Sequence, residues 1–147
     1  MVIPISFIHV VIMRTTLLFL NLITGCIFYQ FTQKYFFPIN GCYKAMARDY
    51  DGDGDLDIAT ISFFADYERQ PEEGFVYLKN EGSFNFSPYS VPEAQSGRWL
   101  TMDVGDLDGD GKIDIVLGNF TLGPSAIKPK GDPSQTPPFI ILKNTGK

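Results

Sequence analysis

DYDGDGDLD at residues 49–57 is nearly repeated as DLDGDGKID at residues 106–114. In the first stretch Asp recurs on every second residue, and the second departs from this pattern only in having Lys112 at the seventh position; in both, Gly occupies the fourth and sixth positions and an apolar run follows. Carboxylates held a few ångströms apart repel one another, so a loop of this kind resists carrying its full charge. A hard cation removes that cost, because Ca²⁺ binds carboxylate and carbonyl oxygens at about 2.3–2.6 Å. The repeated stretch predicts two calcium loops, called loop 1 (residues 49–57) and loop 2 (residues 106–114) below.

Each loop begins like an EF-hand loop, with Asp at its first and third positions and Gly at its sixth. An EF-hand then requires a bidentate Glu at the twelfth position, where this chain has Thr60 and Leu117. The next acid comes at the ninth position instead, as Asp57 and Asp114, at the start of a predicted strand. We therefore expect a shorter loop that closes onto a β-sheet.

The seventh position differs in charge between the copies, with Asp55 in loop 1 and Lys112 in loop 2. A cationic side chain is no ligand, so this position is expected to contribute its backbone carbonyl. The first, third, fifth and ninth positions then supply carboxylates. The predicted metal ligands are Asp49, Asp51, Asp53, Asp55 and Asp57 for one Ca²⁺, and Asp106, Asp108, Asp110, Lys112 and Asp114 for a second.

The rest of the chain after residue 37 has the residue pattern of β-strands. Runs rich in β-branched and aromatic residues follow the loops, and similar runs recur between them. Strands are predicted at 42–47, 58–64, 75–80, 83–87, 98–104, 113–120 and 139–144. The strands at 75–80 and 139–144 both lead into Leu-Lys-Asn-x-Gly, which is a turn signal. No stretch here has a convincing helical period.

The first residues of the two loops lie 57 residues apart. A four-stranded antiparallel unit that repeats at about this interval is typical of a propeller blade. We therefore expect an all-β fold of about two antiparallel blades of a partial β-propeller, the first over 38–92. The second, over 97–147, is expected to lack its last strand because the chain ends at Lys147.

The amino-terminal segment, residues 1–37, differs in composition, because the chain has no Asp or Glu before Asp49. Apolar runs at 2–13 and 17–31 are separated by Arg14, and neither alone reaches the roughly 18 residues that span a bilayer. Together they are long enough for a transmembrane segment. Strands of an incomplete blade and an unreliable gene start are further interpretations.

An export signal is another interpretation of the same segment. If translation begins at Met13, Arg14 is a short basic region and residues 17–23 are an apolar core. Residues 23–26 (Ile-Thr-Gly-Cys) then resemble a bacterial lipobox, although the residues after Cys26 are more apolar than a usual lipoprotein tether. Loops of this kind suit the millimolar calcium outside cells, so we expect an extracytoplasmic location: secreted, on the cell surface or membrane-anchored. The two cysteines, Cys26 and Cys42, are expected to be buried thiols rather than a disulfide.

The pattern Asp-x-Asp-Gly-Asp-Gly-x-[Leu/Ile]-Asp-Ile resembles the FG-GAP/VCBS repeat family, which builds the β-propeller of integrin α subunits and occurs in many bacterial surface proteins. The resemblance covers about residues 38–147. It implies one bound Ca²⁺ per loop and a role in adhesion or ligand binding, often as one module of a larger protein. A closed propeller needs about four to eight blades, so we expect further blades from a longer parent protein or from association.

Three functional hypotheses follow. The first is a non-enzymatic, calcium-stabilised module that presents residues 65–74 and 121–138 to a protein or glycan. Trp99 and Tyr67 are candidate ligand contacts, although the alternating strand around Trp99 favours a core position. The second is part of a propeller-type hydrolase or lyase that acts on glycans. The third is a piece of a reading frame without separate activity.

The chain offers little for catalysis or for nucleic-acid binding. Its only histidine, His9, lies in the apolar start, and no nucleophile stands beside a base in a recognisable arrangement. The net charge is −5, and the basic residues are scattered singly, which excludes a basic stripe for nucleic acid. They are interpreted as solvated surface charges: Lys79, Arg98, Lys128, Lys130 and Lys143.

Overall fold

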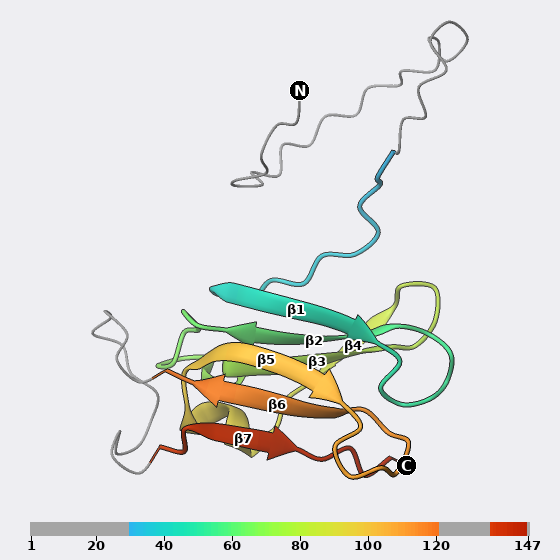
Figure 1. The fold of residues 1–147 in the computed structure, drawn as a ribbon. Helices are drawn as coiled ribbons and strands as arrows, with labels where there is room; N and C mark the ends of the chain where they lie inside the picture. The colour runs from blue at the N-terminus through green and yellow to red at the C-terminus, as the bar shows by residue number, and fades with distance from the viewer. Residues whose placement is uncertain (1–29, 121–135, 147) are drawn as a thin grey trace, which may run out of the picture. The chain divides into compact units, whose positions relative to one another are not determined.

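The computed structural model describes residues 30–120 and 136–146, and Gln33–Lys147 form one compact unit (Figure 1). Most of the predicted apolar segment, residues 1–37, lies outside the described residues, so its role as signal or anchor stays a prediction. Within the described part of the chain, no helix combines the length and apolarity needed to cross a membrane.

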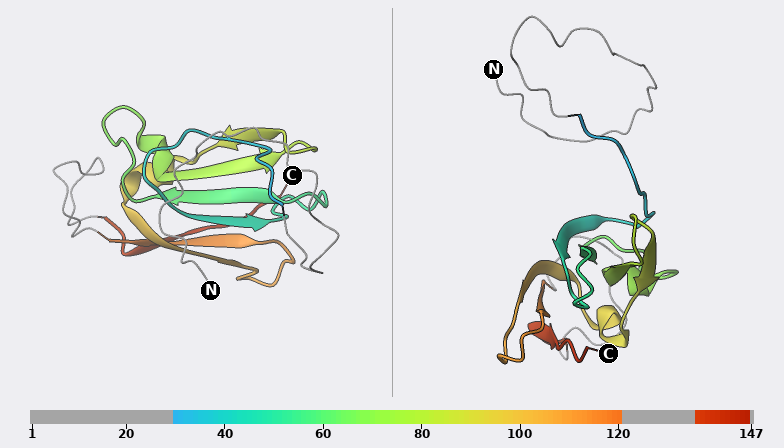
Figure 2. Two further views of the ribbon diagram at one scale, coloured as in Figure 1. Left: turned by 90° about the horizontal axis from the view of Figure 1, so that it is seen from above. Right: turned by 90° about the vertical axis from the view of Figure 1, so that its right-hand side faces the viewer.

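In the described residues seven strands form two antiparallel sheets, which confirms the expected all-β class with partial blades (Figure 1). The first sheet has the order β1-β2-β3-β4 and the second the order β5-β6-β7. Their bounds are β1 Cys42–Arg48, β2 Asp57–Ser62, β3 Phe75–Asn80, β4 Phe86–Tyr89, β5 Trp99–Gly105, β6 Asp114–Asn119 and β7 Phe139–Leu142. Two short 3-10 helices, η1 (Pro71–Gly74) and η2 (Pro92–Ser96), lie on the connections, and η2 lies between the sheets in sequence (Figure 2).

The two sheets repeat the same register around the acidic loops. The last paired residues before loop 1 are Arg48 and Asp57, and the last before loop 2 are Gly105 and Asp114. Each loop therefore joins the first two strands of its sheet and enters the second strand at its ninth residue. A register irregularity also recurs at the start of the first strand of each sheet.

The hydrophobic core is shared by the sheets. Ala59, Ile61 and Phe75 from the first sheet pack in one cluster with Trp99 and other buried side chains of the second. Trp99 is 0 % exposed, and its indole Nε1 donates a hydrogen bond to the carbonyl of Ala94 at 2.9 Å. The prediction that Trp99 is a core residue is confirmed. Because the sheets bury this apolar surface together, their relative position is fixed by packing as well as by the connecting chain.

The strand predicted at 83–87 begins later than expected. Ser83 and Phe84 adopt left-handed backbone angles, with φ of 56° and 62°, and follow Gly82 at φ 96°. These residues form a hairpin turn, closed by the amide of Glu81, which donates to the carbonyl of Asn85 at 2.7 Å. The alternating pattern of the sequence did not reveal that turn, so β4 covers Phe86–Tyr89 instead.

The prediction of buried thiols is wrong for Cys42. It lies at the start of the edge strand β1 and is a free, exposed cysteine. An edge strand has a neighbour on one side only, which leaves its first residue open to solvent. Cys26 lies outside the described residues.

Candidate metal centres

The backbone of each acidic loop curls around the carboxylate of its first residue. In loop 1 the amides of Gly52 and Gly54 donate to the two oxygens of Asp49, at 2.8 and 3.1 Å. Both glycines have positive φ, of 79° and 95°, a conformation that residues with a side chain rarely adopt. This explains why glycine occupies the fourth and sixth positions.

Loop 2 reproduces this arrangement. The amides of Gly109 and Gly111 donate to the two oxygens of Asp106, at 2.7 and 2.9 Å. Backbone amides thus offset part of the negative charge of both loops, since a hydrogen bond to an ionised carboxylate stabilises the charged form.

The ninth residue of each loop anchors the loop to the sheet. Asp57 is 0 % exposed and accepts hydrogen bonds from the amide of Tyr50 at 3.2 Å and the amide of Asn80 at 2.7 Å. Asp114 is 2 % exposed and accepts the equivalent bonds from the amides of Leu107, at 3.1 Å, and Asn144, at 2.8 Å. Each buried carboxylate therefore joins the start of its loop to the end of the third strand in its sheet.

A turn that occurs in both repeats completes this anchor. The side-chain amide of Asn80 donates to the carbonyl of Leu56 at 3.2 Å, and that of Asn144 donates to the carbonyl of Ile113 at 3.3 Å. Asn144 also donates to the carbonyl of Tyr50 at 2.6 Å, which links the second repeat to loop 1. The Leu-Lys-Asn-x-Gly sequence was interpreted only as a turn signal, but its asparagine also holds the eighth residue of the loop.

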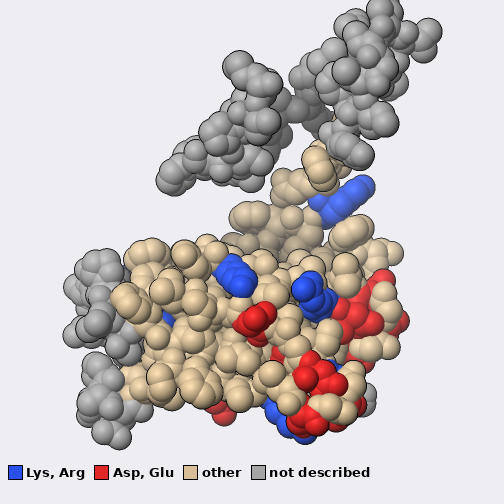
Figure 3. Space-filling model, in the orientation of Figure 1, with Lys and Arg blue, Asp and Glu red and all other residues tan. Residues whose placement is uncertain are grey.

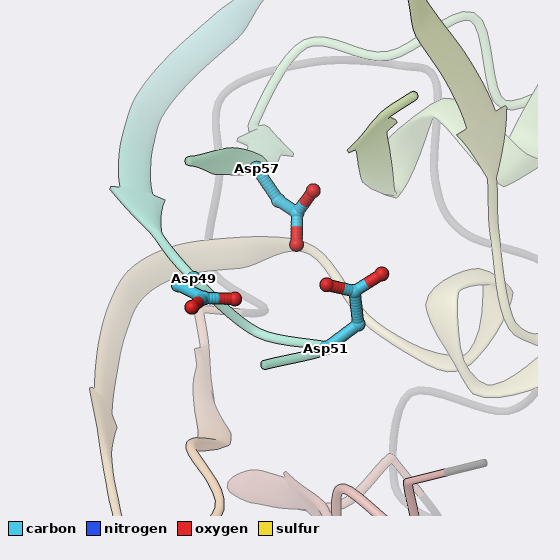
Figure 4. Close-up of side chains that lie close together, drawn as sticks. All are labelled: Asp49, Asp51 and Asp57. Atoms are coloured by element: carbon cyan, nitrogen blue, oxygen red, sulfur yellow. The ribbon is translucent and has the colours of Figure 1, made fainter. Parts of the chain in front are cut away.

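Three carboxylates gather in each loop. Oxygen atoms of Asp49, Asp51 and Asp57 lie within 4.8 Å of one another, and Figure 4 shows these side chains turned toward a common space. The equivalent group in loop 2 consists of Asp106, Asp108 and Asp114. The structure thus brings together the first, third and ninth positions of both predicted ligand sets.

The fifth and seventh positions are not among the gathered carboxylates. Asp53 and Asp110 are exposed, and each accepts a hydrogen bond from the amide two residues later, at 2.9 and 3.0 Å. Asp55 is exposed, and Lys112 directs its ammonium to the carbonyl of Thr145 at 2.9 Å. Metal coordination by Asp53, Asp110 and the carbonyls of Asp55 and Lys112 stays a prediction.

Two lysines reach the loops from the neighbouring strands. The Nζ of Lys79 lies 2.9 Å from the Oδ2 of Asp51, and the Nζ of Lys143 forms an ion pair with Asp108. Acidic side chains gather where the two loops lie at one end of the unit, with basic side chains beside them (Figure 3). Sequence reasoning treated both lysines as scattered surface charges, although each directly precedes the asparagine of the repeated turn.

These ion pairs shift the ionisation of both partners. The hydrogen bond from Lys79 lowers the pKa of Asp51, and the hydrogen bond from Lys143 lowers the pKa of Asp108. The pKa of each lysine is raised by the same bond. The third-position carboxylates are therefore held in the charged form, which is the form that binds a cation.

The anchor of loop 1 carries one group that loop 2 lacks. The hydroxyl of Tyr77 donates to the Oδ2 of Asp57 at 2.7 Å, whereas the equivalent residue of the second repeat is Ile141. Burial is the larger cause of a raised pKa at Tyr77, and the hydrogen bond to Asp57 is the second. The hydroxyl therefore stays a donor at neutral pH. Burial also raises the pKa of the nearby Tyr50 to about 12.

The comparison with known protein families agrees with this geometry. Residues 49–117 match the family model described as an FG-GAP-like repeat. Over these residues the chain is similar to the FG-GAP-like repeat family. The matched residues extend from loop 1 through most of β6 and so include both acidic loops of the repeat. No curated protein and no solved structure gives a significant match to the chain.

The donor set of the two loops fits a hard cation. The gathered side chains offer carboxylate oxygens, which suit Ca²⁺ and Mg²⁺ better than softer metals. A carboxylate accepts about four hydrogen bonds, and Asp57 already accepts three from protein groups. Asp57 therefore keeps one acceptor position for a cation, whereas Asp49 and Asp51 face the shared space with fewer hydrogen bonds from protein groups.

Two other candidate contacts have different outcomes. Tyr67 was a candidate ligand contact, and that prediction is wrong, because its side chain is 2 % exposed. Its hydroxyl donates to the carbonyl of Ser62 at 3.3 Å, and the guanidinium of Arg98 lies over its ring. His9, the only histidine, lies outside the described residues.

Proposed function

We propose that this chain is a calcium-stabilised, non-enzymatic module of a β-propeller protein that acts outside the cytoplasm. In this role Asp49, Asp51 and Asp57 hold one Ca²⁺ together with Asp53 and backbone oxygen, and the equivalent residues of loop 2 hold a second. The bound ions neutralise the gathered carboxylates. Asp57 and Asp114, which are hydrogen-bonded to the ends of the third strands, link this stabilisation to the sheets.

The anchoring aspartates are the observation that carries the proposal. Asp57 belongs to the gathered carboxylates of loop 1 and is also hydrogen-bonded to the amide at the end of β3. Asp114 has the same two roles for loop 2 and β7. An ion that orders either loop therefore favours the pairing of strands next to it, because only the folded state brings these groups together.

The sheet end opposite the loops is the proposed ligand-binding region. The connection at residues 65–74 contains exposed Glu68, Arg69 and Gln70 next to buried residues that hold it in place. Connections carried by a rigid scaffold are common binding elements in proteins. The proposed partner is a protein or glycan rather than nucleic acid, and the apolar segment 1–37 is proposed to serve export or membrane attachment.

Calcium-dependent thermal unfolding of the full chain tests this function. At about 10 mM Ca²⁺ we expect the melting temperature to rise by roughly 5–20 °C relative to chelator, if each of the two sites binds with a Kd of about 0.1–1 mM. Asp53→Ala is expected to reduce the rise by about half, because it removes a proposed ligand whose carboxylate accepts a hydrogen bond from within the same loop, from the amide of Asp55.

Asp103→Ala is the matched control. Asp103 is exposed on β5, outside both loops, and its carboxylate accepts a hydrogen bond from the next backbone amide. This variant should retain the full calcium-dependent rise. A melting temperature that is the same in calcium and in chelator would reject the proposed function.

A further inference from the structure

Each calcium loop has a cation of its own, supplied by the neighbouring strand. Lys79 at the end of β3 pairs with Asp51, and Lys143, directly after β7, pairs with Asp108. The two lysines occupy equivalent places in the repeat and contact the same oxygen, Oδ2, of the same loop position. One such ion pair on a surface carries little meaning, but its repetition in both copies indicates a built feature.

The carboxylate that each lysine contacts belongs to the gathered group. Asp51 and Asp108 are each one of the three side chains whose oxygens lie within 4.8 Å of one another. A divalent ion in that space and an ammonium on the same carboxylate repel each other at short range. The ammonium must therefore move away, or the ion binds more weakly than it would in the same loop without the lysine.

Loop 2 carries more positive charge than loop 1. The Nζ of Lys143 pairs with Asp108 and also lies 3.6 Å from the Oδ2 of Asp110. The Nζ of Lys112 lies 3.8 Å from the same Oδ2 of Asp110. Loop 1 has Asp55 at the place of Lys112, and its one lysine partner, Lys79, is also shared with Glu81 at 3.9 Å. The fifth-position carboxylate is thus flanked by ammonium groups only in loop 2.

We propose that Lys79 and Lys143 are tethered counter-cations that compete with calcium for the third-position carboxylates, and that Lys112 makes loop 2 the weaker calcium site. This inference rests on the proposed calcium binding and adds what sets its strength. In the absence of calcium the lysines keep the loops folded by pairing with charges that otherwise repel. When calcium binds, the lysines reduce its affinity, which keeps both sites responsive at the calcium concentrations of extracellular modules.

A calcium titration of the full chain, followed by amide NMR, resolves the two loops. The amides of Gly54 and Gly111 each donate to the first aspartate of their own loop, so each reports on one site. In the wild-type chain we expect the resonance of Gly54 to saturate at lower calcium than that of Gly111, by at least about threefold.

Charge-removing variants then test the competition itself. Lys79→Met is expected to tighten calcium binding at Gly54 by about tenfold and to leave Gly111 unchanged, and Lys143→Met is expected to do the reverse. Without calcium, both variants should melt at a lower temperature, because the loop loses its counter-charge. Lys79→Gln should match Lys79→Met, because the charge rather than the packing of the side chain is responsible.

Lys34→Met is the control for net charge. Lys34 is exposed and lies outside both repeats, so its removal changes the total charge equally without touching a loop. It should shift neither titration. If Lys79→Met and Lys143→Met bind calcium no more tightly than the wild type, the inference is wrong while the proposed function stands. If neither glycine responds to calcium in the wild type, both are wrong.

Discussion

Loop 1 and loop 2 are alike where they meet the sheets and different where they face solvent. Both have a first aspartate wrapped by two glycine amides and a buried ninth aspartate bound to a strand-end asparagine. They differ at the seventh position, where Asp55 in loop 1 is replaced by Lys112 in loop 2, and at the anchor, where Tyr77 is replaced by Ile141. The two copies therefore share the backbone conformation of the loop and its hydrogen bonds to the sheet, whereas the charge of the loop differs between them.

The anchoring aspartates are the most deeply buried carboxylates of the two loops, so removing one should have the largest effect. Asp57→Ala leaves three donors without a partner, those of Tyr50, Tyr77 and Asn80, in a site that is 0 % exposed. Asp114→Ala leaves two. We expect losses in the free energy of unfolding of about 3–5 kcal/mol for Asp57→Ala and about 2–3 kcal/mol for Asp114→Ala.

Urea unfolding in the presence of chelator measures this difference. The fluorescence of Trp99, the only tryptophan, follows the core shared by the two sheets. Asp103→Ala serves as the surface control and should change stability by less than about 0.5 kcal/mol. Equal losses for the two anchors, or a larger loss for Asp114→Ala, would contradict the role assigned to Tyr77.

The link between the repeats gives a smaller, more local effect. Asn144 donates to the carbonyl of Tyr50 in loop 1 as well as to that of Ile113, whereas Asn80 donates only within its own repeat. We expect Asn144→Ala to cost about 1–2 kcal/mol and Asn80→Ala about 1 kcal/mol.

Amide NMR distinguishes this link from a general loss of stability. The amide of Asp51 belongs to the same peptide group as the carbonyl of Tyr50, so Asn144→Ala should move its resonance from the other repeat. The finding would be overturned if the resonances of loop 1 in Asn144→Ala matched those of the wild type.

Much of the fold could be predicted because its signals are local. The glycines at the fourth and sixth positions indicate backbone with positive φ. The alternating apolar residues predict the bounds of β1, β2, β3 and β6 to within two residues. The start of β4 could not be predicted, because Ser83 and Phe84 have no intrinsic preference for positive φ. The turn geometry, rather than residue type, determines their conformation.

The candidate sites were predictable only in part. The spacing of aspartates identified both loops, but it did not separate carboxylates that gather, such as Asp49 and Asp51, from exposed ones such as Asp53. Lys79 and Lys143 are far from their partners in sequence, and only the register of β3 and β7 beside the loops brings them together. The sequence signal for these two lysines is that they occupy the same position of the repeated Leu-Lys-Asn-x-Gly turn, which an alignment of the two repeats shows.

A crystal structure of the full chain grown in about 10 mM CaCl₂ tests the central claim most directly, namely that these acidic loops are calcium sites tied to the sheets. We predict an ion in each loop, with oxygens of the gathered aspartates at about 2.3–2.6 Å and with Lys79 and Lys143 displaced from Asp51 and Asp108. Intact sheets in which both lysines still pair with these aspartates and neither loop holds an ion would contradict the account.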